Sequence, residues 1–238
     1  MTKYTSKELL GKPDNKLSKG KLTFIITIQT LIIVALCAAL GIYFGPKVGL
    51  TDRFLQGITQ GELHLSDFYL QLKIGALAGI VCSLTWMISY YGFIRHRLDR
   101  ESLFITENLR HQLGLWTRVT SGGITEEVIF RWGLLSLVMW LFSLLISSET
   151  TVFWIAITVT GMIFGLAHLP GNLAAGCKPS VMLVTTAIIG NLWVSVFCGY
   201  LFWKYGLIAA IIVHILFHVL WYPWDQVAYK KLKNEVNL

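Results

Sequence analysis

Long apolar runs separated by short polar segments dominate the pattern of this chain. A transmembrane helix needs about 20 predominantly apolar residues, and six stretches approach or exceed that length, the fourth and sixth being short. The stretches are Leu22–Phe44, Tyr69–Ile94, Gly123–Ile146, Val152–Leu169, Val181–Trp203 and Leu207–Tyr222. The pattern therefore predicts an all-α fold, a polytopic bundle of about six membrane-spanning helices.

The segment Leu103–Val119 breaks this pattern because it is too polar to span a membrane. Leucines and aromatic residues alternate there with charged ones, which predicts an amphipathic helix at the membrane surface. The chain then divides into four parts: a basic N-terminal segment (1–21), two membrane helices and a basic loop (22–120), a four-helix core (121–222) and a basic tail (223–238). Two small-xxx-small pairs, Gly75 with Gly79 and Gly161 with Gly165, predict close helix packing.

Composition narrows the class of protein. Hydrophobic residues make up 55% of the chain and charged residues 14%, against about 45–50% and 25% in soluble domains. This excludes a soluble enzyme, a disordered chain and a nucleic-acid binder. The net charge of +7 then reports topology, because Lys and Arg accumulate in cytoplasmic loops.

Counting the cations across the six predicted spans orients the chain. One side holds Lys3, Lys7, Lys12, Lys16, Lys19, Lys21, Arg95, Arg97, Arg100, Arg110, Arg118, Lys178, Lys230, Lys231 and Lys233, whereas the other holds Lys47, Arg53 and Lys204, with Lys73 nearby. We therefore expect both termini in the cytoplasm.

Charged residues within a predicted span are candidates for function because they are costly in lipid. The third span opens with Glu126 and Glu127 and carries Arg131 more than a turn inside. Glu127 and Arg131 share one helix face at a spacing of four residues, so an ion pair between them is expected. Glu126 projects about 100° away. The alternative without a function is that all three charged residues lie at the cytoplasmic end of the helix.

Three histidines fall in or beside spans: His168, His214 and His218. A single such histidine is more often a satisfied core residue than a functional one. The predicted topology, however, places all three and Glu126 in the cytoplasmic half of the bilayer. His214 and His218 share a helix face, and Phe164 stands one turn before His168. An acid and several imidazoles at one depth indicate a catalytic constellation.

A carboxylate with imidazoles supports hydrolysis by either of two routes. The carboxylate activates water directly while imidazoles stabilise the oxyanion, or two histidines and a glutamate hold a catalytic zinc. The sequence has no His-Glu-x-x-His and no Gly-x-Ser-x-Gly, and no Asp lies within the predicted spans. These absences argue against other intramembrane hydrolases, including paired-aspartate proteases.

Glu126-Glu127-x-x-x-Arg131, Phe164-x-x-x-His168 and His214-x-x-x-His218, in that order, resemble the three motifs of the CAAX-processing and bacteriocin-processing (CPBP, or Abi) intramembrane proteases. The resemblance covers residues 120–222, and the type II CAAX prenyl endopeptidases are related. It implies that Glu126 is the base, that Glu127 and Arg131 support it, and that His168, His214 and His218 complete the site. The third motif commonly ends in Asn, so His218 is a departure.

The resemblance implies a membrane-embedded endopeptidase, bacterial and in the plasma membrane, whose partners are a peptide or membrane-anchored protein substrate and the lipid bilayer. Prenylation of the substrate is not assumed. No cofactor is required by the favoured glutamate mechanism; in the zinc alternative, His168 and His214 would hold the metal. The runner-up is a non-enzymatic membrane regulator or scaffold of the same fold. A transporter is disfavoured because no inverted repeat is found in the sequence.

Overall fold

The computed structural model describes residues 19–236, and this part of the chain is helical and contains no strand. The predicted segment 1–21 therefore lies almost entirely outside the described residues. The elements are α1 (Lys19–Phe44), η1 (Gly45–Val48), α2 (Arg53–Gln60), α3 (Leu65–Ser89), η2 (Tyr90–Ile94), η3 (Arg95–Arg97), α4 (Arg100–Thr117), η4 (Arg118–Thr125), η5 (Glu127–Leu135), α5 (Ser136–Ser143), α6 (Glu149–Ala167), α7 (Leu169–Ala174), α8 (Val181–Lys204) and α9 (Leu207–Val236). The all-α class is confirmed.

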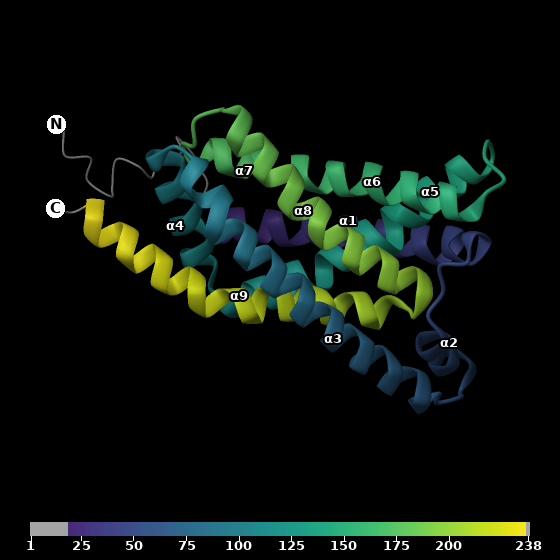
Figure 1. Ribbon diagram of the computed structural model, residues 1–238. Coiled ribbons are helices and arrows are strands. Elements are labelled where there is room, and N and C mark those ends of the chain that lie inside the picture. Colours follow the sequence, from purple (N-terminus) through teal and green to yellow (C-terminus); the bar gives the residue numbers. More distant parts are fainter. Residues whose placement is uncertain (1–18, 237–238) are drawn as a thin grey trace.

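Five segments within residues 19–236 are long and apolar enough to cross a membrane. They are Thr23–Val48, Leu65–Arg97, Glu149–Ala174, Val181–Lys204 and Leu207–Glu235. Their lipid-facing character is visible in α1, where Phe24, Leu31 and Ile32 are exposed. The chain is thus an integral membrane protein, with its long helices side by side (Figure 1).

The predicted span Gly123–Ile146 is not among these five segments. It is helical throughout its first part, but η4 and η5 are wide π-helical turns that lead into α5. η5 packs against α1, α6, α8 and α9, so protein rather than lipid surrounds its polar side chains. A helix in this central position can carry charges that a lipid-facing span cannot.

Glycines set the distance between the helices that flank the core. A Cβ at Gly75 or Gly79 of α3 would lie 2.9–3.0 Å from atoms of α9, and one at Gly165 of α6 would lie 2.6 Å from the Ile188 backbone of α8. Neighbouring helices approach closely because these residues have no side chain. The predicted role of the small-xxx-small pairs in packing is confirmed.

The predicted surface helix is present as α4. Asp99 caps its start by accepting a hydrogen bond from the amide of Ser102, and Leu103 and Ile105 are buried. The chain bends at Gly114, whose φ of 67° is the left-handed region that favours glycine. Helix α4 packs against α9 at one end of the bundle, while α2 lies at the other end (Figure 1).

Helix α9 begins at a polar cluster and runs further than the sequence predicts. Asp52 accepts hydrogen bonds from the amides of Leu55 and Ile208 and from the side chain of Gln71, whose own carbonyl accepts from Ala209. These contacts satisfy the first amides of α9. At its other end α9 continues past the predicted boundary at Tyr222, so most of the predicted tail is helix.

Candidate active site

A cavity of about 770 Å³ lies between α3, α4, η4, α6, α7, α8 and α9. The four predicted catalytic side chains all line it: Glu126, His168, His214 and His218. It is also lined by Asn172 of α7 and Leu183 of α8. The structure thus brings together residues from three separate helical segments that the sequence placed at one depth.

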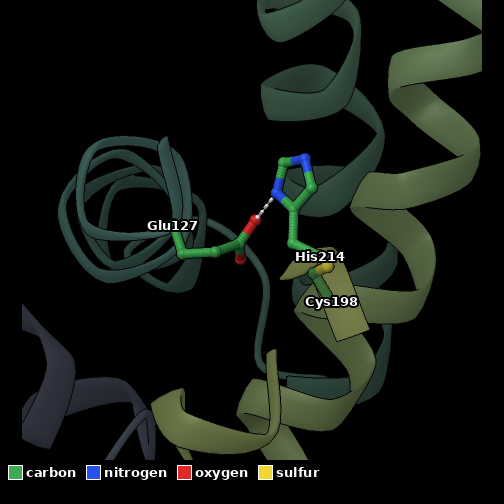
Figure 2. Close-up of side chains that lie close together, drawn as sticks. All are labelled: Glu127, Cys198 and His214. Atoms are coloured by element: carbon green, nitrogen blue, oxygen red, sulfur yellow. Dashed lines mark hydrogen bonds and ion pairs between the residues drawn. The ribbon is translucent and has the colours of Figure 1, made fainter. Parts of the chain in front are cut away.

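Glu127 stands behind the cavity wall in a fully buried network. Its Oε1 lies 2.6 Å from Nδ1 of His214, and the two side chains point toward each other (Figure 2). Its Oε2 lies 3.3 Å from Nε of Arg131. Arg131 in turn donates to the hydroxyl of Ser195 over 3.1 Å. The expected ion pair between Glu127 and Arg131 is therefore present, and Glu127 also accepts a hydrogen bond from His214.

Glu126 has a different environment although it is the neighbouring residue. Its side chain is 25% exposed, and its Oε2 lies 4.0 Å from Nε2 of His214. It makes no hydrogen bond to any side chain among the described residues, and it faces the cavity. The two carboxylates thus lie at opposite nitrogens of the His214 ring. Glu127 contacts Nδ1, whereas Glu126 lies 4.0 Å from Nε2.

The ring nitrogens of His168 and His214 have defined roles. Nδ1 of His168 lies 2.9 Å from the carbonyl of Phe164, which can only accept, so this nitrogen donates. Nδ1 of His214 donates to the Glu127 carboxylate in the same way. In each neutral ring the lone pair is therefore on Nε2. The ring of Phe164 meets His168 edge-on at 5.0 Å, which restrains its orientation.

His218 stacks on His214, with the ring centroids 4.9 Å apart and the planes 24° from parallel. Its Nδ1 has no hydrogen-bond partner among the described residues. The close approach of this ring depends on Gly122, because a Cβ there would overlap its imidazole. The departure from Asn at this position therefore places a second imidazole, with an unsatisfied nitrogen, beside the first.

A catalytic zinc ion needs three protein ligands whose donor atoms converge on one point. Within residues 19–236, three potential ligand atoms converge within 4.8 Å only in Glu127, Cys198 and His214. There the guanidinium of Arg131 contacts Glu127 and opposes a further cation. His168, named for the zinc alternative, is not part of a converging trio. The residues present do not fit a zinc site.

Several contributing residues were not found by sequence reasoning. Ser195 and Cys198 look like ordinary small residues of an apolar span, and only the contacts with Arg131 and the position beside Glu127 single them out. Asp225 was placed outside the predicted spans, but it lies within the segment Leu207–Glu235 and is buried. It contacts two arginines rather than a second aspartate, so no paired-aspartate centre forms there.

These features define the class: an integral membrane protein that holds an acid and three imidazoles around an internal cavity. Residues 111–220 match the family model of the Rce1-like type II CAAX prenyl endopeptidases. The matched segment contains all three motifs and confirms the resemblance to the CPBP family of intramembrane proteases. No curated protein and no solved structure matches the chain.

Proposed function

We propose that the protein is an intramembrane endopeptidase that hydrolyses a peptide bond near the cytoplasmic face of the membrane, with Glu126 as the base that activates water. The observation that carries this proposal is the division of labour between two adjacent glutamates. Glu127 is buried and bonded to His214, whereas Glu126 makes no hydrogen bond to a side chain within residues 19–236. Glu126 faces the cavity, and its Oε2 lies 4.0 Å from Nε2 of the same ring.

A water molecule fits the geometry between Glu126 and His214. Two hydrogen bonds of about 2.8 Å can bridge atoms up to roughly 5.6 Å apart, so a gap of 4.0 Å leaves room for one water contacting both. Such a water donates one hydrogen to the Glu126 carboxylate and the other to the Nε2 lone pair of His214. Its own lone pair is then directed into the cavity, where a substrate carbonyl would lie.

Hydrolysis follows from this arrangement. Glu126 removes a proton from water as the oxygen attacks the carbonyl carbon, and the carbonyl π electrons move to the oxygen. When the tetrahedral intermediate collapses, the C–N bond breaks and Glu126 returns the proton to the leaving amine. His218, whose Nδ1 lacks a partner, supplies an N–H to the oxyanion, and His168 presents Nε2 to the substrate or to water.

The buried network behind the site fixes His214. The Glu127 carboxylate holds the Nδ1 proton of the ring and thereby sets the tautomer. Arg131 balances the charge of that carboxylate in a place without solvent. Glu127 and Arg131 are therefore positioning residues, which the resemblance also implies.

The proposed location at the cytoplasmic face rests on charge. The cavity is lined by Arg110 of α4 and by Asn172 of α7, and α4 lies at the end of the bundle where α9 ends (Figure 1). This end carries the arginines of α4 and the lysines of the last turns of α9. An excess of Lys and Arg marks the cytoplasmic side.

Replacing Glu126 tests the proposal. In Glu126→Gln the shape is kept but no proton can be accepted, so cleavage of quenched peptides from a random library should fall about 10²–10⁴-fold. The matched control is Glu62→Gln, since Glu62 is an exposed glutamate distant from the cavity. A strong chelator should leave the rate unchanged, because the one converging trio within residues 19–236 (Glu127, Cys198 and His214) lies beside the Arg131 guanidinium, which opposes a further cation. Purified protein in detergent serves for both measurements.

The scaffold alternative makes the opposite prediction. If the wild-type protein cleaves no peptide of the library and Glu126→Gln keeps the protein's cellular activity, the enzyme proposal is wrong. If the chelator lowers the rate of cleavage and added zinc recovers it, the metal-dependent mechanism would instead be supported.

A further inference from the structure

A second buried charge cluster lies against the cavity, outside the three motifs. It contains three arginines and two carboxylates. They are Arg95, Arg110, Arg118, Glu107 and Asp225. Both carboxylates are almost completely buried. Counting formal charges, the cluster carries one excess positive charge, although Arg95 and Arg110 are only 20% and 23% exposed.

Arg118 is the member that the cluster does not need for neutrality. Glu107 is bonded to Arg95 over 2.7 Å, and both oxygens of Asp225 accept from Nε of Arg110 over 3.1 Å. Arg118 adds a contact of 2.6 Å from its Nη2 to Asp225, already paired with Arg110. Its remaining charge has no separate counter-ion among the described residues.

The position of Arg118 is fixed although its charge is not balanced. The side chain is 5% exposed, its Nη2 also donates to the carbonyl of Arg110, and its Nε has no hydrogen-bond partner among residues 19–236. The guanidinium lies 5.3 Å from the ring of Tyr222. A buried, pre-oriented guanidinium with spare donor capacity is suited to bind a carboxylate.

Arg110 is held in the charged state by the same surroundings. Burial alone would lower its pKa, but Asp225, Tyr90 and Glu107 together raise the pKa above its ordinary value. Tyr90 contributes a direct contact, because Arg110 donates to its hydroxyl over 2.9 Å. Arg110 therefore keeps its positive charge throughout the physiological pH range.

Arg110 and Arg118 line the same cavity as Glu126 and His218. Any molecule whose peptide bond reaches Glu126 therefore shares this space with the two guanidinium groups. We propose that Arg118, oriented by Asp225 and Arg110, binds a carboxylate of the peptide substrate, from either its C-terminus or an acidic side chain. This role rests on the proposed function, and the substrate feature that Arg118 would recognise is a carboxylate.

Two features favour binding over a purely structural role. Arg110 already neutralises the charge of Asp225, so Arg118 is not required for that purpose. The excess positive charge of the cluster also destabilises the fold, and a substrate anion would remove that penalty when it binds. Arg118 is thus a specificity-determining residue, and it stands eight residues before the proposed base in a continuous helical stretch.

Matched peptides test the inference. One sequence cleaved by the wild-type protein is prepared as the free acid, as the C-terminal amide, and with its single acidic side chain changed from Glu to Gln. We expect one of the two neutral forms to lose about 10- to 100-fold in kcat/KM, mainly through KM, as for a lost hydrogen bond to a charged group. The form that loses activity identifies the source of the carboxylate.

Arg118→Gln should abolish this preference by lowering activity only on the charged peptides. Arg100→Gln is the matched control, because Arg100 is an exposed arginine of the same region. If Arg118→Gln does not fold, Arg118→Lys keeps the charge but loses the planar fork, and the preference should fall severalfold. Equal losses on charged and neutral peptides, or a wild-type protein indifferent to both changes, would overturn the inference.

Binding separates this inference from the proposed function. Glu126→Gln protein should bind the charged peptide about 10- to 100-fold more tightly than the neutral form that loses activity, measured by titration calorimetry in detergent. Absence of cleavage by the wild-type protein would contradict the endopeptidase proposal alone. Equal dissociation constants for all three peptides would contradict the carboxylate site alone.

Discussion

Two buried carboxylate clusters contact helix α9, one at its first turn and one about two turns further along. At the first turn, both oxygens of Asp52 accept hydrogen bonds, and Asp52 does not line the cavity that holds Glu126. At the second, Glu127 is buried between His214 and Arg131, although its Oε2 makes no hydrogen bond within residues 19–236, whereas Glu126 beside it faces the cavity. A carboxylate that only stabilises a fold is held by partners inside the protein, whereas a base must face the space that holds water and substrate.

The wide helical turns that carry Glu126 and Glu127 add to this contrast. Asp52 sits at the N-cap of α2, where a short side chain bonds the local backbone. The two glutamates instead lie where two π-helices meet: Glu126 stands between η4 and η5, and Glu127 is the first residue of η5. Such turns are rare and occur often at functional sites. Here the side chains of Glu126 and Glu127 lie at opposite nitrogens of the His214 imidazole.

The largest effect on stability should come from Glu127. In Glu127→Gln the amide can still accept from His214, but Arg131 loses its counter-ion inside the bundle. Removing one partner of a buried ion pair costs about 3–5 kcal/mol. Unfolding in detergent, followed by circular dichroism, should show this loss.

A double variant provides the control for this pair. Glu127→Gln with Arg131→Met removes the stranded charge, so part of the lost stability should return while activity stays low. A Glu127→Gln protein as stable as the wild type would mean that the pair does not support the site.

The next effect concerns geometry rather than charge. Gly122→Ala places a methyl group where the imidazole of His218 lies, so the ring must move away from His214. A displacement of about 1 Å at a catalytic group can cost about 100-fold in rate, and we expect a 10- to 100-fold loss in kcat. Gly92→Ala is the control, because a Cβ there meets nothing within 4 Å. Equal activity of the two variants would argue against a role for His218.

The sequence predicts the parts of this architecture that depend on neighbouring residues. Apolar runs mark the long helices, and a spacing of four residues predicts the pair of Glu127 with Arg131. The predicted topology places Glu126 and the histidines at one depth, and all four line one cavity. These predictions follow from helix periodicity, from the length of the apolar runs and from the distribution of Lys and Arg.

Contacts between distant segments could not be predicted in this way. Glu127 and His214 are 87 residues apart, and Arg118 and Asp225 are 107 apart. Their meeting depends on how α9 packs against η4 and η5, which a single sequence does not encode as a visible pattern. The π-helical turns were missed for a related reason, because local propensity does not distinguish them from α-helix.

The smallest expected effect comes from Asp52 and separates the two clusters most clearly. In Asp52→Asn an NH₂ group replaces one of the accepting oxygens and must face a donor, either the amide of Ile208 or the amides of Leu55 and Gln71. An unsatisfied buried donor costs about 1–3 kcal/mol, so the unfolding midpoint should fall. The value of kcat for the folded fraction should stay that of the wild type, because neither Asp52 nor Gln71 is among the residues that line the cavity. Peptide cleavage measured below the unfolding transition checks this directly, with Asp67→Asn as the control in the same region. A fall in kcat without loss of stability would show that Asp52 acts on the cavity through α9, and the distinction between a structural and a catalytic carboxylate would then no longer hold.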